Sequence, residues 1–239
     1  MEKMKGLPVL RLILIRHGQT AGNLEKRYVG KTDEALAEAG ICLLNEKKAR
    51  HTYPPADVVI TTPYRRCLQT AKFLYPETEM HIEPQLGEMD FGEFEYRNYI
   101  ELSGNTAYQA WIDSGGTAAF PGGESMDAFE ERCQSAFRRA IKELIQEDIK
   151  KDIKKDIKKD IKKEETDNAE KLQQAIPTAA LVVHGGTIMA LLHRMGIPKQ
   201  EYFSYQCKNG DGYTAELYCG ETGFQIRQIQ KLKGQEETT

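Results

Sequence analysis

Two segments of the chain place a histidine between a run of apolar residues and a glycine. Arg16 and His17 follow the run VLRLILI, and His184 and Gly185 follow AALVV. A neutral imidazole can act as a nucleophile. An arginine at the end of a buried segment is unfavourable unless an anion accompanies it, and its guanidinium suits phosphate oxygens. The residue types therefore indicate chemistry on a phosphorylated compound.

Phosphoryl transfer also needs positive charge for the phosphoryl oxygens and a proton for the leaving oxygen. The segment TTPYRRCLQTA puts the paired arginines Arg65 and Arg66 in the first turn of a predicted helix, where the backbone N–H groups also attract anions. The segment LGEMDFGE supplies carboxylates for the proton donor. On composition alone, Glu88, Asp90 and Glu93 all remain candidates for that role.

The elements that must position these residues alternate between strands and helices. Apolar runs predict buried parallel strands at 9–15, 57–61 and 179–183, with a weaker strand at 79–83. Helical patterns cover 38–50, 63–74, a long stretch after the N-cap Ser125, and 187–195, and alternation at 213–219 and 223–230 predicts a hairpin. We therefore expect a three-layer α/β/α sandwich with a mostly parallel central sheet, whose ligand lies beyond the carboxyl ends of the strands.

We expect residues 1–239 to form a single domain with two additions. Residues 84–124 carry scattered aromatic residues, glycines and short helical fragments, which is typical of an inserted lid. Residues 148–163 repeat the tetrapeptide DIKK four times. We expect 148–168 to be a charged helix that projects from the body. It is either a low-complexity extension without a catalytic role or a stalk whose isoleucine stripe binds a partner helix.

Composition excludes several function classes. The net charge of −3 and pI of about 6.0 give no electrostatic argument for binding nucleic acid. We find no apolar run of the length that a membrane span needs and no targeting signal, so we expect a cytoplasmic protein. The five cysteines are widely spaced and include no CxxC pair, which indicates ordinary thiols rather than disulfides or a zinc site.

Together, the order of these motifs resembles the histidine phosphatase superfamily, the phosphoglycerate mutase-like or RHG proteins. The matching segments are RHGQTAGN, GKTDEALAEAG, TTPYRRCLQTA, GEMDFGEFE, FPGGES and VVHGGTIMALL. The resemblance implies that His17 attacks phosphorus and carries a phosphohistidine. It implies that Arg16, Arg66 and His184 bind the phosphoryl oxygens, and that Glu88 protonates the leaving alcohol. No metal and no cofactor are implied.

The resemblance also implies a set of residues that bind phosphate or substrate. These residues are Asn23, Gln19, Thr20 and Gly185. Two positions depart from the family pattern. Gln19 stands where glutamate is usual, and Tyr96 stands where a glycine commonly follows the FG-x-x-E stretch. The second departure falls in the predicted lid, so we expect it to affect substrate shape more than chemistry.

The lid favours a small phosphatase over a mutase, because 91–125 resembles the shorter phosphatases, including α-ribazole phosphatase-like proteins. We therefore predict a phosphatase acting on a small-molecule phosphomonoester, with α-ribazole 5'-phosphate as one substrate. The alternatives are phosphoglycerate mutase-type transfer and, in another class, a non-catalytic phosphate-binding or scaffolding protein. The lid aromatics Tyr96, Tyr99, Tyr108, Trp111 and Phe120 either contact an aromatic substrate or form the core of the lid. A homodimer is one assembly to test.

Overall fold

The computed structural model describes residues 8–159, 176–220 and 223–234. A mixed sheet of six strands forms its centre, in the order β3-β2-β4-β1-β5-β6. The first four strands in that order run parallel, and β5 and β6 are antiparallel additions at one edge. The strands are β1 (Leu10–Arg16), β2 (Val58–Thr61), β3 (Met80–Ile82), β4 (Thr178–Val183), β5 (Gly212–Gly220) and β6 (Gly223–Lys231).

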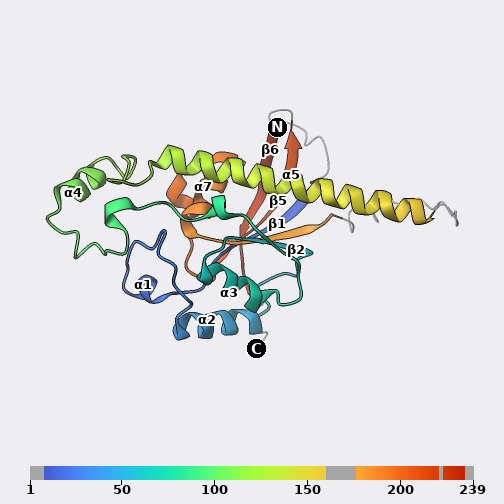
Figure 1. Ribbon diagram of the computed structural model, residues 1–239, viewed down its shortest axis with the longest axis horizontal. Coiled ribbons are helices and arrows are strands. Elements are labelled where there is room, and N and C mark those ends of the chain that lie inside the picture. Colours follow the sequence, from blue (N-terminus) through green and yellow to red (C-terminus); the bar gives the residue numbers. More distant parts are fainter. Residues whose placement is uncertain (1–7, 160–175, 221–222, 235–239) are drawn as a thin grey trace.

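Helices cover both faces of the sheet, as Figure 1 shows. On one face, Leu12 and Leu14 of β1 pack in a cluster with α5 (Met126–Lys159) and α7 (Gly185–Met195). On the other face, Ile13 and Ile15 pack in a cluster with α3 (Arg65–Leu74). This alternation follows from the two-residue period of a strand. The predicted three-layer sandwich with a mostly parallel sheet is confirmed.

The remaining helices lie near the carboxyl ends of the parallel strands. They are α1 (Ala21–Leu24), α2 (Glu38–Ala49) and α4 (Thr106–Asp113), with short 3-10 helices at Pro84–Leu86, Gly92–Phe94 and Tyr202–Tyr205. Two predicted helix starts were displaced by two residues. The helix after β2 begins at Arg65 rather than Pro63, and the helix after β4 begins at Gly185 rather than Thr187.

Helix α5 extends beyond the body of the molecule. Its backbone is helical from Met126 to Lys159, so it includes three of the four DIKK repeats. Figure 1 shows its carboxyl-terminal part projecting past the sheet, at the end of the molecule opposite α4. The fourth repeat and the rest of the predicted 148–168 extension lie outside the described residues. Among the described residues, no helix is long and apolar enough to cross a membrane.

Candidate active site

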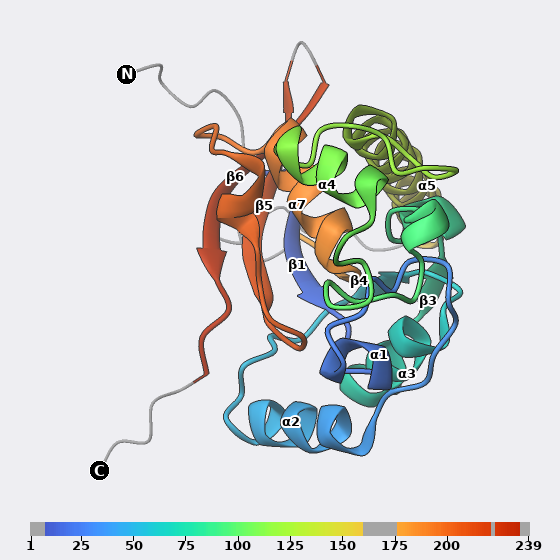
Figure 2. The ribbon, with the colours of Figure 1, turned by 90° about the vertical axis from the view of Figure 1, so that its left-hand side faces the viewer.

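A cavity of about 260 Å³ opens beyond the carboxyl ends of β1 and β4. Figure 2 looks onto the end of the molecule where α4 lies, with α7 and β1 behind it. The polar part of the cavity wall comes from the residues Arg16, His17, Asn23, Arg27, Glu88, Gly185, Gly186 and Gln206. The sequence placed five of these eight residues in the candidate site, and the fold brings those five together.

His17 is buried, and its ring has a defined tautomer. Its Nδ1 lies 2.7 Å from the backbone oxygen of Gly18. A carbonyl oxygen can only accept, so Nδ1 carries the proton and Nε2 has a free lone pair. Burial, followed by the charges of Arg66 and Arg16, holds the pKa of His17 well below its usual value. The imidazole is therefore neutral, which is the state that a nucleophile requires.

Arg16 lies beside His17 and offers its guanidinium to the cavity. Its Nη1 donates to the backbone oxygen of Cys207 at 2.8 Å. Its Nε is buried and has no hydrogen-bond partner among the described residues. A Cβ on Gly185 would lie 3.1 Å from that Nε, so glycine leaves the room that this guanidinium occupies. An anion in the cavity would satisfy the unpaired donor.

Arg66 and His184 are fully buried and are not among the described residues that line the cavity. The amino groups of Arg66 donate to the backbone oxygens of Thr32 at 2.6 Å and Gly30 at 2.8 Å. Its Nε lies 3.3 Å from Nδ1 of His184. Because a guanidinium can only donate, Nδ1 of His184 accepts, and its Nε2–H then donates to the Thr62 hydroxyl at 3.0 Å. Direct contact of either residue with phosphate stays a prediction.

The two histidines are nevertheless neighbours. The ring centroids of His17 and His184 lie 5.3 Å apart in an edge-on arrangement. Burial, followed by the charge of Arg66, also holds the pKa of His184 well below its usual value. The two HG motifs at separate strand ends therefore converge, as the parallel topology requires.

Glu88 faces the start of α7 across the cavity. Its Oε2 accepts from the backbone N–H of Gly186 at 3.0 Å, and its Oε1 accepts from that of Met89 at 2.9 Å. A Cβ on Gly186 would lie only 2.1 Å from Oε1. The competing carboxylates are placed elsewhere: Asp90 pairs with Lys31 at 2.5 Å, and Glu93 is exposed. Of the three candidates, only Glu88 is among the cavity residues.

Asn23 lines the cavity, whereas Gln19 and Thr20 support the loop behind it. The hydroxyl of Thr20 caps α1 by accepting from the backbone N–H of Asn23. Oδ1 of Asn23 accepts from Nδ2 of Asn209 at 3.0 Å, so the amide Nδ2 is the group that Asn23 can offer a ligand. Gln19 accepts from Ala37 through its backbone oxygen.

The rest of the cavity wall is apolar and largely aromatic. It is formed by Tyr28, Val29, Met89, Phe91, Trp111, Phe120, Met126, Met189, Tyr202, Phe203 and Cys207. The lid aromatics divide between the cavity wall, the core and the surface, and contact with an aromatic substrate stays a prediction. Trp111 and Phe120 line the cavity and stack on each other with centroids 4.9 Å apart. Tyr108 belongs to the core, and Tyr96 and Tyr99 are exposed.

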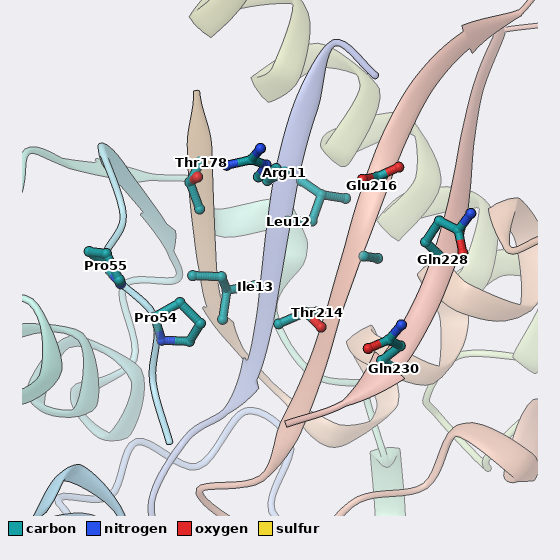
Figure 3. A pocket seen from close by; sticks show the side chains of 11 residues that line it. Arg11, Leu12, Ile13, Pro54, Pro55, Thr178, Thr214, Glu216, Gln228 and Gln230 are labelled. Atoms are coloured by element: carbon teal, nitrogen blue, oxygen red, sulfur yellow. The ribbon is translucent and has the colours of Figure 1, made fainter. Parts of the chain in front are cut away.

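A larger hollow of about 380 Å³ lies on the face of the sheet away from α5 and α7. Figure 3 shows its wall, which comes from β1, β4, β5, β6 and the loop before β2. The described residues that line it include no histidine, and Thr178 and Arg11 belong to the amino-terminal parts of their strands. In α/β sheets, ligands usually bind beyond the carboxyl ends of the strands, and the larger hollow lies away from that edge. The smaller cavity lies at that edge and is therefore the candidate site.

Three polar residues that the sequence did not single out hold this site together. Glu95 accepts from the backbone N–H groups of Gly30 and Thr32, and so fixes the turn whose carbonyls bind Arg66. Asn209 donates to the backbone oxygen of His17 at 3.1 Å. Arg132 of α5 donates to the backbone around Glu88. Glu95 is the last residue of the FGEFE motif, which could have marked it as part of the site. Arg132 and Asn209 lie outside every motif recognised in the sequence.

Comparison with known proteins places the chain in a family. Residues 12–150 match the model of the histidine phosphatase superfamily (branch 1). The chain is 33% identical over 137 residues to "Adenosylcobalamin/alpha-ribazole phosphatase" of Salmonella typhimurium, covering 54% of this chain and 66% of that protein. It is 29% identical over 139 residues to "Probable phosphoglycerate mutase GpmB" of Proteus mirabilis, covering 56% of this chain and 64% of that protein.

A solved structure extends the likeness to nearly the whole chain. The alpha-ribazole phosphatase from Shigella flexneri superposes with a TM-score of 0.66 at 22% identity. The superposition covers 96% of this chain and 100% of that one, which is a likeness of fold. The family match over residues 12–150 includes His17, Arg16, Arg66 and Glu88. The chain belongs to the histidine phosphatase superfamily.

Proposed function

We propose that this protein hydrolyses a small-molecule phosphomonoester through a phosphohistidine on His17. One observation carries the proposal. The 2.7 Å contact between Nδ1 of His17 and the backbone oxygen of Gly18 leaves Nε2 unprotonated in a cavity that also presents Arg16 and Glu88. Membership of the histidine phosphatase superfamily supports the same chemistry.

In the first step, Nε2 of His17 forms a bond to phosphorus as the bond from phosphorus to the ester oxygen breaks. The leaving oxygen takes a proton from the carboxyl group of Glu88, and the alcohol departs. Arg16 neutralises charge on the phosphoryl oxygens, which is the main catalytic contribution in phosphoryl transfer. Behind His17, the guanidinium of Arg66 adds positive charge, and the neutral ring of His184, which is bonded to it, adds rigidity to this wall.

In the second step, water attacks phosphorus and the bond to Nε2 breaks. The carboxylate of Glu88 takes the proton from water, so phosphate leaves and both His17 and Glu88 return to their starting states. The net reaction consumes one ester and one water and yields one alcohol and one phosphate. A single carboxyl group can serve both steps because its protonation state alternates between them.

The aromatic wall of the cavity supports a substrate with a flat, apolar alcohol part. Trp111, Phe120 and Phe91 offer ring surface within the same cavity as the nucleophile. We propose α-ribazole 5'-phosphate as the first substrate to test. Two relatives that this chain matches over 66% of their length are named adenosylcobalamin/alpha-ribazole phosphatase. Phosphoglycerate mutase-type transfer is the second candidate, since other relatives are named for it.

The experiment compares wild type with His17→Ala and with His81→Ala, whose side chain is one-third exposed on β3. Wild type and the His81 variant should form an acid-labile phosphoenzyme and release inorganic phosphate, whereas the His17 variant should do neither. Wild-type-like turnover in the His17 variant would overturn the mechanism. Rapid isomerisation of 3-phosphoglycerate with a trace of bisphosphate, without phosphate release, would favour the mutase.

We propose further that the protein works in the cytoplasm and that residues 84–124 form a lid over the site. The absence of a nucleic-acid partner is a proposal supported by the net charge of −3. A homodimer is also a proposal. Light scattering on the purified chain would distinguish it from a monomer.

A further inference from the structure

Arg132 of α5 donates hydrogen bonds to several backbone oxygens next to Glu88. Nη1 of Arg132 donates to the backbone oxygens of Gln85 at 2.7 Å and Gly87 at 3.2 Å. Its Nη2 donates to the backbone oxygen of Glu88 at 3.2 Å and to Oε2 of Glu124 at 2.8 Å. Its Nε donates to Oε1 of Glu124 at 2.8 Å. These five bonds match the five N–H groups of a guanidinium.

Glu124 connects this arginine to the residue two positions beyond Glu88. Its Oε2 accepts from the backbone N–H of Asp90 at 2.9 Å, and its own N–H donates to the backbone oxygen of Asp90 at 3.0 Å. Burial opposes ionisation of Glu124, but hydrogen bonds from Arg132 and Asp90 outweigh it and hold its pKa below the usual range. Both ends of the 85–90 segment are thus fixed to one ion pair.

The carboxylate of Glu88 depends on this backbone for its position. It reaches the cavity from a turn that has no regular strand or helix of its own between Leu86 and Gly92. Thr187 adds one more bond to the turn, from its hydroxyl to the backbone oxygen of Leu86 at 3.0 Å. The guanidinium of Arg132 thus makes three hydrogen bonds to the backbone of the 85–90 segment, and that backbone carries the carboxyl group that Gly186 and Met89 bind.

We propose that Arg132, oriented by Glu124, is a positioning residue for Glu88 and thereby sets how well the enzyme expels strongly basic leaving groups. The proposal rests on the proposed function, in which Glu88 protonates the leaving oxygen. An alkoxide needs that proton, whereas a nitrophenolate leaves without it. General acid catalysis contributes about 10²–10⁴-fold, and a misplacement of about 1 Å can remove a large part of it.

The chain offers a matched control on the same helix. Arg139 lies about two turns further along α5, and its Nη2 donates to the Glu83 carboxylate at 2.7 Å. Arg139 binds the side chain of Glu83, two positions before this segment, and within the described residues it makes no hydrogen bond to the backbone of 85–88. Replacing it therefore removes a charge from α5 without removing the contacts that hold Glu88.

The experiment measures phosphoenzyme formation in single turnovers with p-nitrophenyl phosphate and with glycerol 3-phosphate. For Arg132→Gln, we expect the glycerol phosphate rate to fall on the order of 10–100-fold and the nitrophenol burst to fall less than about threefold. Arg132→Lys should show a smaller loss in the same direction, because an ammonium cannot bind carboxylate and carbonyls as a fork. Glu88→Gln should show the same selectivity, and Arg139→Gln should change neither rate.

Equal losses on both esters in Arg132→Gln would overturn the proposal, because a merely structural role would not distinguish leaving groups. Unchanged rates on both would overturn it too. If Arg132→Gln does not fold, judged by circular dichroism, Arg132→Lys and Glu124→Gln decide by the same ratio of rates. If wild type forms no phosphohistidine with either ester, the proposed function fails at its first step, whereas a failure of the positioning role alone leaves wild-type turnover intact.

Discussion

The two strand ends that carry histidine share a sequence pattern and differ in what their ring nitrogens do. At the end of β1, His17 uses one nitrogen on its neighbour's carbonyl and keeps the other free in the cavity. At the end of β4, both nitrogens of His184 are engaged, by Arg66 and by Thr62. The pattern of strand, histidine and glycine therefore predicts a position at the sheet edge, and the surrounding hydrogen bonds decide whether one ring nitrogen stays free.

The largest expected effect comes from replacing the free nitrogen. In His17→Asn, phosphate release should fall on the order of 10⁵-fold, because removal of a nucleophile is not compensated by the remaining groups. After a quench in SDS at alkaline pH, in which phosphohistidine survives, wild type should retain labelled phosphate and this variant should retain none. A labelled phosphoenzyme in this variant would mean that another residue is the nucleophile. The free ring nitrogen would then not distinguish His17 from His184 in function.

A smaller effect of a different kind is expected at the second strand end. His184→Asn should lower the rate on the order of 10²-fold, the loss expected when a supporting side chain is removed and the reacting groups shift by about 1 Å. The variant should still form the phosphoenzyme, only more slowly. Rapid-quench kinetics on both variants would separate slow formation from no formation. Complete absence of phosphoenzyme in His184→Asn would mean that the support role assigned here is wrong.

The comparison also marks how far sequence reasoning reaches. The two HG motifs, Arg16 and the mostly parallel sheet could be predicted because each depends on a local run of residues or on the alternation of strands and helices. Family resemblance favours Glu88 over Asp90 and Glu93 as the proton donor, and of these three only Glu88 lies in the cavity wall. Phosphate binding by Arg66 stays a prediction, and nothing in the sequence indicated that its amino groups donate to the backbone oxygens of Thr32 and Gly30.

The supporting residues escaped sequence reasoning for a physical reason. Asn209 binds the backbone of His17, which is 192 positions away in the chain, and Arg132 binds that of Glu88, 44 positions away. A backbone oxygen is present at every position, so no residue type in the sequence marks it as a partner. Long-range bonds from side chain to backbone become visible only once the chain is folded.

The two glycines after His184 lie against different site residues, so replacing each of them should have a different effect on the rate. Gly186→Ala should lower the rate on the order of 10–100-fold, because its Cβ would lie 2.1 Å from a carboxylate oxygen of Glu88 and must displace it. Gly185→Ala should cost less, since its nearest atom is the flexible Arg16 guanidinium at 3.1 Å. Steady-state rates on one alkyl phosphate would rank the two. The reverse order would show that Arg16 is the more tightly constrained partner.

The smallest expected effect is on stability in acid, where the two strand ends should behave alike. Burial lowers the pKa of both His17 and His184, so below pH 6.5 the unfolded chain binds protons that the folded chain excludes. The free energy of unfolding should therefore fall as pH decreases from 6.5 toward the folded pKa values. Each histidine should contribute up to about 1.4 kcal/mol per pH unit in that window.

Urea unfolding between pH 7 and pH 5 would measure how the free energy of unfolding changes with pH. The proteins to compare are wild type, His17→Asn, His184→Asn and the double variant. Each single replacement should flatten the slope by one histidine's share, and the double replacement should remove both shares.

The same depressed pKa predicts that phosphoenzyme formation does not decline between pH 7 and pH 6, because His17 stays neutral there. A decline centred at pH 6.5 would mean that this imidazole titrates like one in water, and its burial would not protect the nucleophile.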